Sequence, residues 1–383
     1  MMARKILYVT GTRADYGLMS PVLSKIARTP GLSLEIAATG MHLMPEFGTT
    51  INEVKSDPFP VHIIDAVYKN DDSSSMVAFT GRFLCLFNDT LSAIRPDIML
   101  LLGDRAEMLA AAIAGSYRGI PIAHIHGGEV TSTIDEYARH AITKLSHIHM
   151  PATKESAKRI IKLGEDPSHV HVVGAPGLDA LFDPEPLSEK DLKRKYHIQS
   201  KTPFIIVLQH PVSTEEDEAS GQMRETLDAV AGLQIAAIVI YPNADAGGRR
   251  IIDTIQSSKH NPNFRIFRNI PHPEFIMLLK RSAAIVGNSS SAIIEAPSLG
   301  IPAINIGDRQ KGRERGDNVT DVSCEKAEIA AAIAAALEAS HGKKGRKKFF
   351  NPYGGDGKTA DKIAEILLKT PLNESLLKKR LQY

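Results

Sequence analysis

The chain has 383 residues, of which 43% are hydrophobic and 23% are charged, so two globular domains of ordinary size are expected. Its 46 lysines and arginines nearly balance 44 aspartates and glutamates, which gives no bulk charge for binding nucleic acid or a membrane surface. The two cysteines are isolated, and no apolar run is long enough for a signal peptide or a membrane span. We therefore expect a reduced, cytoplasmic protein.

The first half of the chain alternates apolar, β-branched segments with segments of helical period. Continuous apolar runs of this kind are typical of parallel strands that are covered on both faces. We expect strands at residues 5–11, 32–40, 96–104, 120–128, 147–153 and 169–174, and helices at residues 18–29, 105–119, 135–146 and 154–164.

A polar, proline-rich stretch at residues 181–203 is the best candidate for a linker. The alternation resumes after it, with strands expected at residues 204–211, 236–243, 264–269, 283–288 and 301–307, and helices at residues 224–233, 249–258, 273–282, 289–300 and 329–339. Two runs of βαβ units about a linker predict an α/β fold of two doubly wound, Rossmann-like domains that face a cleft.

Ligands of doubly wound domains bind at the carboxyl ends of the strands, so the residues after each strand are the candidates for a site. The first strand is followed by Arg13 in a loop that lacks the GxGxxG pattern of dinucleotide folds. This loop resembles a small anion site, and a tight turn with a surface arginine is the alternative. Asp104 and Arg105 follow another strand, where Asp104 is either catalytic or the cap of the next helix.

The stretch AHIHGGE at residues 123–129 ends a further strand. Alternate residues of a strand point to one face, so His124 and His126 are spaced for a shared metal. The sequence has no HExxH motif and no cysteine partner here, so we expect no metal. His126 and Glu129 are instead candidates for acid–base chemistry, whereas His124 is expected to be structural.

The helix that follows this stretch carries Asp135 and Arg139 one turn apart, and Glu136 and His140 one turn apart. Such pairs are commonly ordinary ion pairs on a helix face. Asp135 is also one of the acidic side chains that this stretch offers to the expected cleft.

The strands of the second half supply different residue types. His210 and Asn243 follow two of them, and Ser289 and Ser290 lead directly into a helix whose Glu295 lies about one turn inside. Free backbone N–H groups and small hydroxyls at a helix start are typical of a phosphate site, although an ordinary serine cap has the same pattern.

Three cations follow the last of these strands: Arg309, Lys311 and Arg313. We expect them to lie close to the turn that contains Ser289 and Ser290, called the serine turn below, where they add positive charge to a phosphate site. A nucleoside diphosphate held by the second domain, with acids and histidines supplied mainly by the first, predicts nucleotide-sugar chemistry.

Ordered motifs across nearly the whole chain then resemble one known family, the hydrolysing UDP-N-acetylglucosamine 2-epimerases of sialic acid biosynthesis. Their relatives that act on UDP-2,4-diacetamido-trideoxy sugars in legionaminic acid pathways are almost as similar. The motifs, in chain order, are GTRADYG, LGDRAE, HIHGGE, RHAITKLSHIH, QHPVST, YPNADAG, GNSSS and INIGDRQKGR.

The resemblance implies a two-domain fold of the glycosyltransferase-B type. The N-terminal domain would span residues 1–182, with a returning C-terminal helix at 366–383, and the UDP-binding domain would span residues 183–365. It implies conversion of UDP-N-acetylglucosamine and water to N-acetylmannosamine and UDP, or the same reaction on UDP-N,N'-diacetylbacillosamine. No cofactor or metal is implied, and the family suggests a homodimer or homotetramer.

The resemblance also assigns residues. Its UDP contacts fall on Arg13, Arg105, His210, Asn243, Ser289, Ser290, Glu295 and Arg309, and its acid–base carboxylates fall on Asp104 and Asp135, with Glu129 a further candidate. Several relatives carry glutamate where this chain has His126. Either this histidine takes the role of that glutamate, or the three carboxylates share it; an imidazole is a suitable acid or base near neutral pH. His210 would assist the departure of UDP.

Three other functions remain open. A UDP-sugar glycosyltransferase of the same fold would need an acceptor site and no base at C2 of the sugar. A non-hydrolysing epimerase resembles this chain less, because its pattern has glutamate at position 126 and an EEANR-like stretch in place of DEYAR. A catalytically inactive sensor of nucleotide sugars would not need the carboxylates at the strand ends.

Overall fold

The computed structural model describes residues 3–199, 202–340, 348–380 and 382. Its first half contains a six-stranded sheet in the order β3-β2-β1-β4-β5-β6, in which all neighbours are parallel. The strands are β1 (Arg4–Thr10), β2 (Leu32–Ala38), β3 (Val61–Ile63), β4 (Ile98–Leu102), β5 (Ile122–Ile125) and β6 (Ile148–Met150). Around them lie α1 (Arg13–Arg28), α2 (Ile51–Ser56), α3 (Ser73–Ile94), α4 (Ala106–Tyr117), α5 (Ile134–Leu145) and α6 (Lys154–Lys162).

The second sheet repeats this topology. Its order is β12-β11-β10-β7-β8-β9. When its strands are numbered from β7 and the order is read from the opposite edge, it is the order of the first sheet. Its strands are β7 (Phe204–Leu208), β8 (Ala236–Ile240), β9 (Phe264–Phe267), β10 (Ile285–Gly287), β11 (Ala303–Ile306) and β12 (Val319–Val322). Its helices are α7 (Glu189–Lys195), α8 (Ala219–Gly232), α9 (Gly248–Ser257), α10 (His272–Arg281), α11 (Ser291–Ile294) and α12 (Lys326–Ser340). The predicted pair of doubly wound domains is therefore confirmed.

Hydrophobic burial explains why the strands were recognisable. All five residues of β4 are buried, as expected of a central strand that helices cover on both faces. The segment at residues 169–174 and the predicted linker differ from the structure. Residues 169–174 form no strand, since only the isolated bridge between His149 and Val170 pairs them with β6, and the proposed linker contains the short helix α7.

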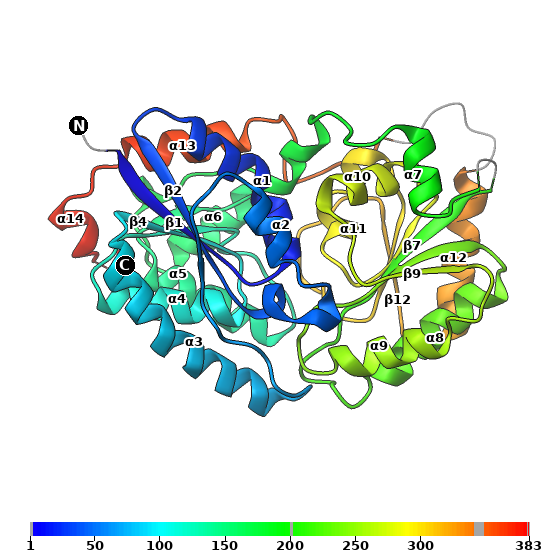
Figure 1. Cartoon of the computed structure of the whole chain (residues 1–383). Coiled ribbons are helices and arrows are strands. Elements are labelled where there is room, and N and C mark those ends of the chain that lie inside the picture. The colour runs from blue at the N-terminus through cyan, green and yellow to red at the C-terminus, as the bar shows by residue number, and fades with distance from the viewer. Residues whose placement is uncertain (1–2, 200–201, 341–347, 381, 383) are drawn as a thin grey trace.

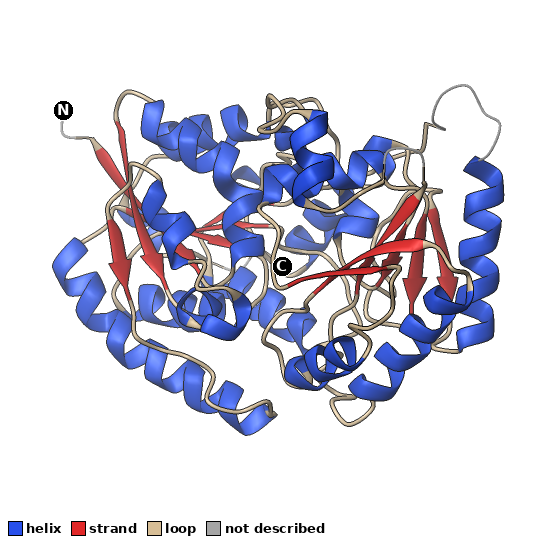
Figure 2. Ribbon diagram, turned by 45° about the vertical axis from the view of Figure 1, so that its right-hand side comes forward, coloured by secondary structure: helices blue, strands red, loops and turns tan. Residues whose placement is uncertain are grey.

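The chain reverses its strand order between β1 and β4 in the first sheet and between β7 and β10 in the second. In doubly wound folds the ligand crevice lies at such a switch point, outside the carboxyl ends of the strands. Figure 1 and Figure 2 show the two sheets side by side, each flanked by helices, with the loops after these strands meeting between them.

The C-terminal segment returns to the first domain. Helix α13 (Thr359–Lys369) packs on α1, and Ile363 and Leu367 lie in the same apolar core as β1 and β2. The short helix α14 (Glu374–Leu377) adds Leu376 to that core. The returning segment therefore begins before the predicted residue 366, because the apolar face of α13 already starts at Ile363. The predicted division between residues 182 and 183 stays a prediction.

Two neighbouring leucines test this return. Leu367 is fully buried, whereas Leu368 is 37% exposed. We expect Leu367→Ala to lower the free energy of unfolding by about 2–4 kcal/mol, because it leaves a cavity between α13 and α1. The matched variant Leu368→Ala should change it by less than about 1 kcal/mol. Denaturant unfolding of both variants measures the difference, and equal losses would contradict the packing described above.

Candidate active site

One cleft between the two sheets is lined by all twelve residues to which the sequence analysis assigned catalysis or UDP binding. These are Arg13, Asp104, Arg105, His126, Glu129, Asp135, His210, Asn243, Ser289, Ser290, Glu295 and Arg309. The cations and hydroxyls of the second domain lie across the cleft from the acids of the first, with Arg13 added from the first domain.

Arg13 is the first residue of α1 and is held in place by the cap of that helix. The Asp15 carboxylate accepts from the backbone N–H groups of Gly11 and Thr12, at 3.1 and 2.8 Å, and so completes a capping box with Thr12. Among the described residues, the Arg13 guanidinium has no hydrogen-bond or ion-pair partner, and burial lowers its pKa to about 10. A largely buried cation without an anion is suited to binding an anionic ligand.

His210 lies just beyond the end of β7 and is oriented by two asparagines. Its Nδ1 accepts from the backbone N–H of Asn243 at 3.2 Å, so the neutral ring carries its proton on Nε2. Asn288 fixes the His210 backbone through bonds of 2.7 and 2.9 Å. Burial, with the nearby Arg309 charge, lowers the pKa of His210 to about 3. His210 thus presents a neutral N–H donor to the cleft rather than a proton acid.

The serine turn differs from its prediction. Helix α11 has only four residues and is followed by a separate turn at Pro297–Leu299, in place of one helix at 289–300. Pro297 has no N–H with which to continue the helix, and Gly300 adopts a left-handed conformation that ends it. Ser289 and Ser290 therefore offer hydroxyls and backbone N–H groups, without the dipole of a long helix.

Two further groups in this half of the cleft have unused acceptors. Oε2 of Glu295 and Oδ1 of Asn243 are buried without a hydrogen-bond partner among the described residues. Burial raises the pKa of Glu295 to about 7. Unpartnered buried oxygens are rare, and here they fit acceptors for the hydroxyl or N–H groups of a bound ligand.

Arg105 and Arg309 connect the two halves of the cleft. Arg105 donates to Glu107 at 2.7 Å and, across the cleft, to Asp245 at 3.1 Å. Arg309 donates to the carbonyl of Asn288 at 3.2 Å, and its other amino group lies 3.9 Å from Asp135. Of the cations after β11, Lys311 points away from the cleft, because it is exposed and pairs with Asp308 at 3.0 Å. Its expected place beside the serine turn was therefore wrong.

The acidic wall begins with Asp104, which forms an ion pair with the buried Arg139. Although burial alone would raise the pKa of Asp104, the Arg139 charge lowers it below its usual range. Arg139 also donates to the backbone carbonyl of Glu129 at 3.0 Å. The expected pair between Asp135 and Arg139 was wrong, since Arg139 pairs with Asp104 instead. The other expected pair, Glu136 with His140, is present at 3.6 Å.

Asp135 differs from Asp104 in its charge environment. Burial and the neighbouring carboxylates Asp104 and Asp245 raise the pKa of Asp135 to about 6. Two acids with separated pKa values, one kept ionised and one able to exchange a proton near neutral pH, are the usual arrangement for general acid–base chemistry.

The HIHGGE stretch completes this wall in a way that the strand pattern did not predict. His124, on β5, is fully buried and bonds through Nε2 to the carbonyl of Gly103 at 2.7 Å. His126 lies beyond the strand end with φ of 62°, so its ring points into the cleft. The two rings therefore do not share a face, and among the described residues no group of three metal-ligating side chains is found.

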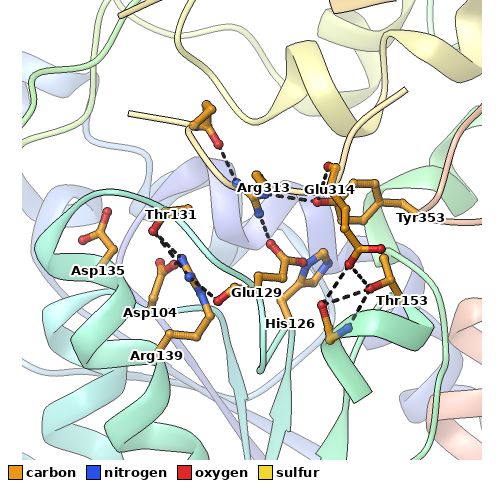
Figure 3. Close-up of polar contacts among 12 residues, drawn as sticks. Asp104, His126, Glu129, Thr131, Asp135, Arg139, Thr153, Arg313, Glu314 and Tyr353 are labelled. Carbon is orange, nitrogen blue, oxygen red and sulfur yellow. Dashed lines mark hydrogen bonds and ion pairs between the residues drawn. The ribbon is translucent and has the colours of Figure 1, made fainter. Parts of the chain in front are cut away.

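His126 is paired with Glu129. Its Nδ1 lies 2.5 Å from Oε1 of Glu129, whose other oxygen accepts from Arg313 (Figure 3). Burial alone would raise the pKa of Glu129, but the charges of Arg313 and His126 lower it well below its usual range. Glu129 is thus a fixed anion rather than a proton carrier.

The sequence did not predict the contacts of Arg139, Arg313 and Tyr353. Arg139 was assigned to the wrong partner, and Arg313 was placed with the phosphate rather than with Glu129. No motif pointed to Tyr353, whose ring centroid lies 6.4 Å from that of His126. The local spacing of residues gives no signal for contacts between distant parts of the chain, such as the one between Arg313 and Glu129, which are 184 residues apart.

A family model for UDP-N-acetylglucosamine 2-epimerase matches residues 24–368. The chain belongs to the UDP-N-acetylglucosamine 2-epimerase family. This confirms the resemblance and the predicted class of enzyme, an epimerase of nucleotide sugars.

Two relatives cover nearly all of this epimerase. It is 41% identical, over 99% of both chains, to the UDP-N,N'-diacetylbacillosamine 2-epimerase (hydrolyzing) of Legionella pneumophila. It is 34% identical, over 95% of both chains, to a UDP-N-acetylglucosamine 2-epimerase of Neisseria meningitidis serogroup B.

Solved structures show the same fold. The epimerase matches the crystal structure of a UDP-GlcNAc 2-epimerase from Neisseria meningitidis bound to UDP-GlcNAc with a TM-score of 0.78 and 22% identity, covering 96% of this chain and 100% of that one. A Methanocaldococcus jannaschii UDP-GlcNAc 2-epimerase also gives a TM-score of 0.78, at 21% identity and over 95% of this chain and 99% of that one. Within the described part of this epimerase, no helix is long and apolar enough to cross a bilayer.

Proposed function

We propose that this epimerase is a hydrolysing enzyme, which converts a UDP-linked 2-acetamido sugar and water to UDP and the free sugar with inverted configuration at C2. One observation carries the proposal. The acid–base groups Asp104, Asp135 and His126 share a single cleft with donors that have no anion to bind, chiefly Arg13 and His210.

The proposed reaction has two half-reactions. A base first removes the proton from C2 while the bond between C1 and the phosphate oxygen breaks, and the electron pair leaves with UDP. Water then adds its oxygen to C1 of the resulting glycal, and an acid returns a proton to C2 on the opposite face. Asp135 is suited to the base role, because its raised pKa makes it a stronger base than an ordinary carboxylate.

Departure of UDP places negative charge on the terminal phosphate. The Nε2–H of His210 and the guanidiniums of Arg13 and Arg309 line the side of the cleft where this charge would develop. Fixed donors of this kind stabilise a leaving group without reorganising, since the protein already holds them in place. Glu295 and Asn243, with their free oxygens, would accept hydrogen bonds from the nucleoside.

Of the two sugars considered, we place UDP-N,N'-diacetylbacillosamine first and UDP-N-acetylglucosamine second. The support is the higher identity to the Legionella pneumophila enzyme, 41% against 34% for the serogroup B Neisseria meningitidis enzyme. Incubation with each sugar nucleotide, followed by mass spectrometry of the products, tests this order. Release of free UDP and a free 2-acetamido sugar is expected, faster from the diacetamido substrate. A product that still carries UDP would contradict the hydrolysing reaction.

His210 gives a direct test of the diphosphate side. We expect His210→Ala to raise the dissociation constant of UDP about 10-fold to 100-fold, because a hydrogen bond to a charged group is lost. Calorimetric titration with UDP measures this, and the exposed His260, in the same domain, provides the control His260→Ala. Unchanged affinity in His210→Ala would contradict the placement of the diphosphate.

We also propose that the enzyme acts in the cytoplasm as a homodimer or homotetramer formed through the first domain. Helices α3, α4 and α5 adjoin one another and expose large apolar side chains, with Val77, Tyr117 and Tyr137 each more than 70% exposed. Light scattering of the purified protein tests the proposal, and a monomeric mass would contradict it.

A further inference from the structure

A segment of the second domain reaches across the cleft to the catalytic wall of the first. Arg313 donates through Nη2 to Oε2 of Glu129, from a loop 184 residues further along the chain. The neighbouring Glu314 accepts from the Thr153 hydroxyl at 2.5 Å, at the start of α6. Figure 3 shows both side chains descending from the second domain onto the first.

Arg313 is itself fixed on its own side. Its Nη1 donates to Gln310 at 3.0 Å and its Nε to the hydroxyl of Tyr353 at 3.3 Å. Tyr353 is fully buried and donates to the carbonyl of Glu314 at 3.0 Å. All three nitrogens of the guanidinium therefore have partners, and its direction toward Glu129 is set by the second domain.

Glu129 divides its two oxygens between the domains. Oε1 pairs with Nδ1 of His126, and Oε2 pairs with Nη2 of Arg313. Only 2% of the Glu129 side chain is exposed. A buried carboxylate is costly unless it is paired, so Glu129 in this position depends on Arg313. The charges of Arg313 and His126 hold the pKa of Glu129 well below its usual range, although burial alone would raise it. It can orient His126, but it cannot take up a proton near neutral pH.

The backbone explains how His126 meets Glu129. His126 has φ of 62° and Gly128 has φ of 76°, so the chain folds back tightly after β5 and brings residues 126 and 129 together. A side chain at position 128 would lie 2.3 Å from the carbonyl of Ser156. With Nδ1 occupied by Glu129, only Nε2 of His126 is left to exchange a proton in the cleft.

We propose that Arg313 is a positioning residue, which completes the His126–Glu129 pair when the two domains close and so makes His126 competent for proton transfer. The inference rests on the proposed function. His126 Nε2 exchanges one proton with C2 of the sugar in one of the two half-reactions, while Nδ1–H stays bonded to Glu129. Domain closure then both excludes bulk water and assembles the proton-transfer group.

The test compares Arg313→Met and Arg313→Lys with the control Lys311→Met, which removes an exposed cation from the same loop. We expect Arg313→Met to lower kcat about 10-fold to 100-fold, the usual effect of losing a group that orients a catalytic side chain, with little change in KM. Arg313→Lys should recover part of this loss, and Lys311→Met should behave like the wild type. A loss confined to KM would overturn the inference.

A double-mutant cycle shows whether Arg313 acts through His126. In a His126→Gln background, Arg313→Met should lower kcat by less than about threefold, because the group that it orients is already gone. An effect as large as in the unmodified protein would overturn the inference.

Nuclear magnetic resonance of the histidine rings separates this inference from the proposed function, since it needs no turnover. In the wild type, His126 should show a protonated Nδ1 with a strongly downfield proton. In Arg313→Met this signal should disappear or shift, while Lys311→Met keeps it. An unchanged His126 signal in Arg313→Met overturns the inference, whereas absence of turnover by the wild type would count only against the proposed function.

Discussion

Replacing Asp135 by asparagine should lower kcat by about 100-fold to 10,000-fold while UDP still binds. Asparagine has nearly the same shape but cannot accept the C2 proton, and a well-placed general base contributes a rate factor of this size. Steady-state kinetics and a calorimetric titration with UDP measure the two quantities separately.

The neighbouring Glu136 provides the matched control. It lies on the same turn of α5, but it bonds to the backbone N–H of Thr131 at 2.8 Å and does not line the cleft. Glu136→Gln should therefore keep kcat within a few-fold of the wild type. Near-normal turnover by Asp135→Asn would show that another group removes the proton.

The same residue predicts the pH dependence of the wild type. Because burial and the charges of Asp104 and Asp245 raise the pKa of Asp135 to about 6, the basic form is lost as the pH falls through this value. We expect kcat/KM to decline about tenfold per pH unit below pH 6, since this parameter reports the free enzyme. In Asp135→Asn, the small remaining kcat/KM should no longer decline in this way below pH 6.

Replacing Asp104 by asparagine should lower both kcat and the free energy of unfolding. Asp104 keeps the buried Arg139 paired and raises the pKa of Asp135. Its removal leaves the guanidinium without a full counter-charge, at a cost of about 1–3 kcal/mol in the free energy of unfolding. The pKa of Asp135 should fall as well, and kcat should drop at least about 100-fold.

Asp65 serves as the control for stability. It also pairs with an arginine, Arg82, at 3.5 Å, but the Asp65 side chain is 81% exposed. Asp65→Asn should change the free energy of unfolding by less than about 0.5 kcal/mol, because exposed ion pairs contribute little. An Asp104→Asn protein as stable and as active as Asp65→Asn would contradict the role of the Arg139 pair.

The fold was predictable where burial dominates the sequence. The continuous apolar run of β4 and the alternation of strands and helices identified two doubly wound domains, because parallel strands must be covered on both faces. Helix α3 was missed although Phe79, Phe83 and Phe87 recur at four-residue spacing and lie fully or almost fully buried. Strand β3 has only three residues, none of them buried, and left no comparable signal.

The sequence predicted which residues line the site, but it did not predict which of them contact one another. Residues that follow strands were placed in the cleft because topology brings strand ends together. The pairing of Arg313 with Glu129 depends on how two domains meet, and the turn of His126 out of its strand depends on a left-handed backbone. Neither is encoded in local spacing, so the strand pattern wrongly put both histidines of HIHGGE on one face.

Incorporation of solvent deuterium at C2 tests the central claim most directly. The enzyme is incubated in D₂O with each UDP sugar, and the released sugar is examined by mass spectrometry and proton magnetic resonance. Removal and return of the C2 proton predict one non-exchanging deuterium at C2 in every product molecule, together with free UDP. Release of UDP with the original proton still at C2 would contradict the account and favour transfer or simple hydrolysis at C1.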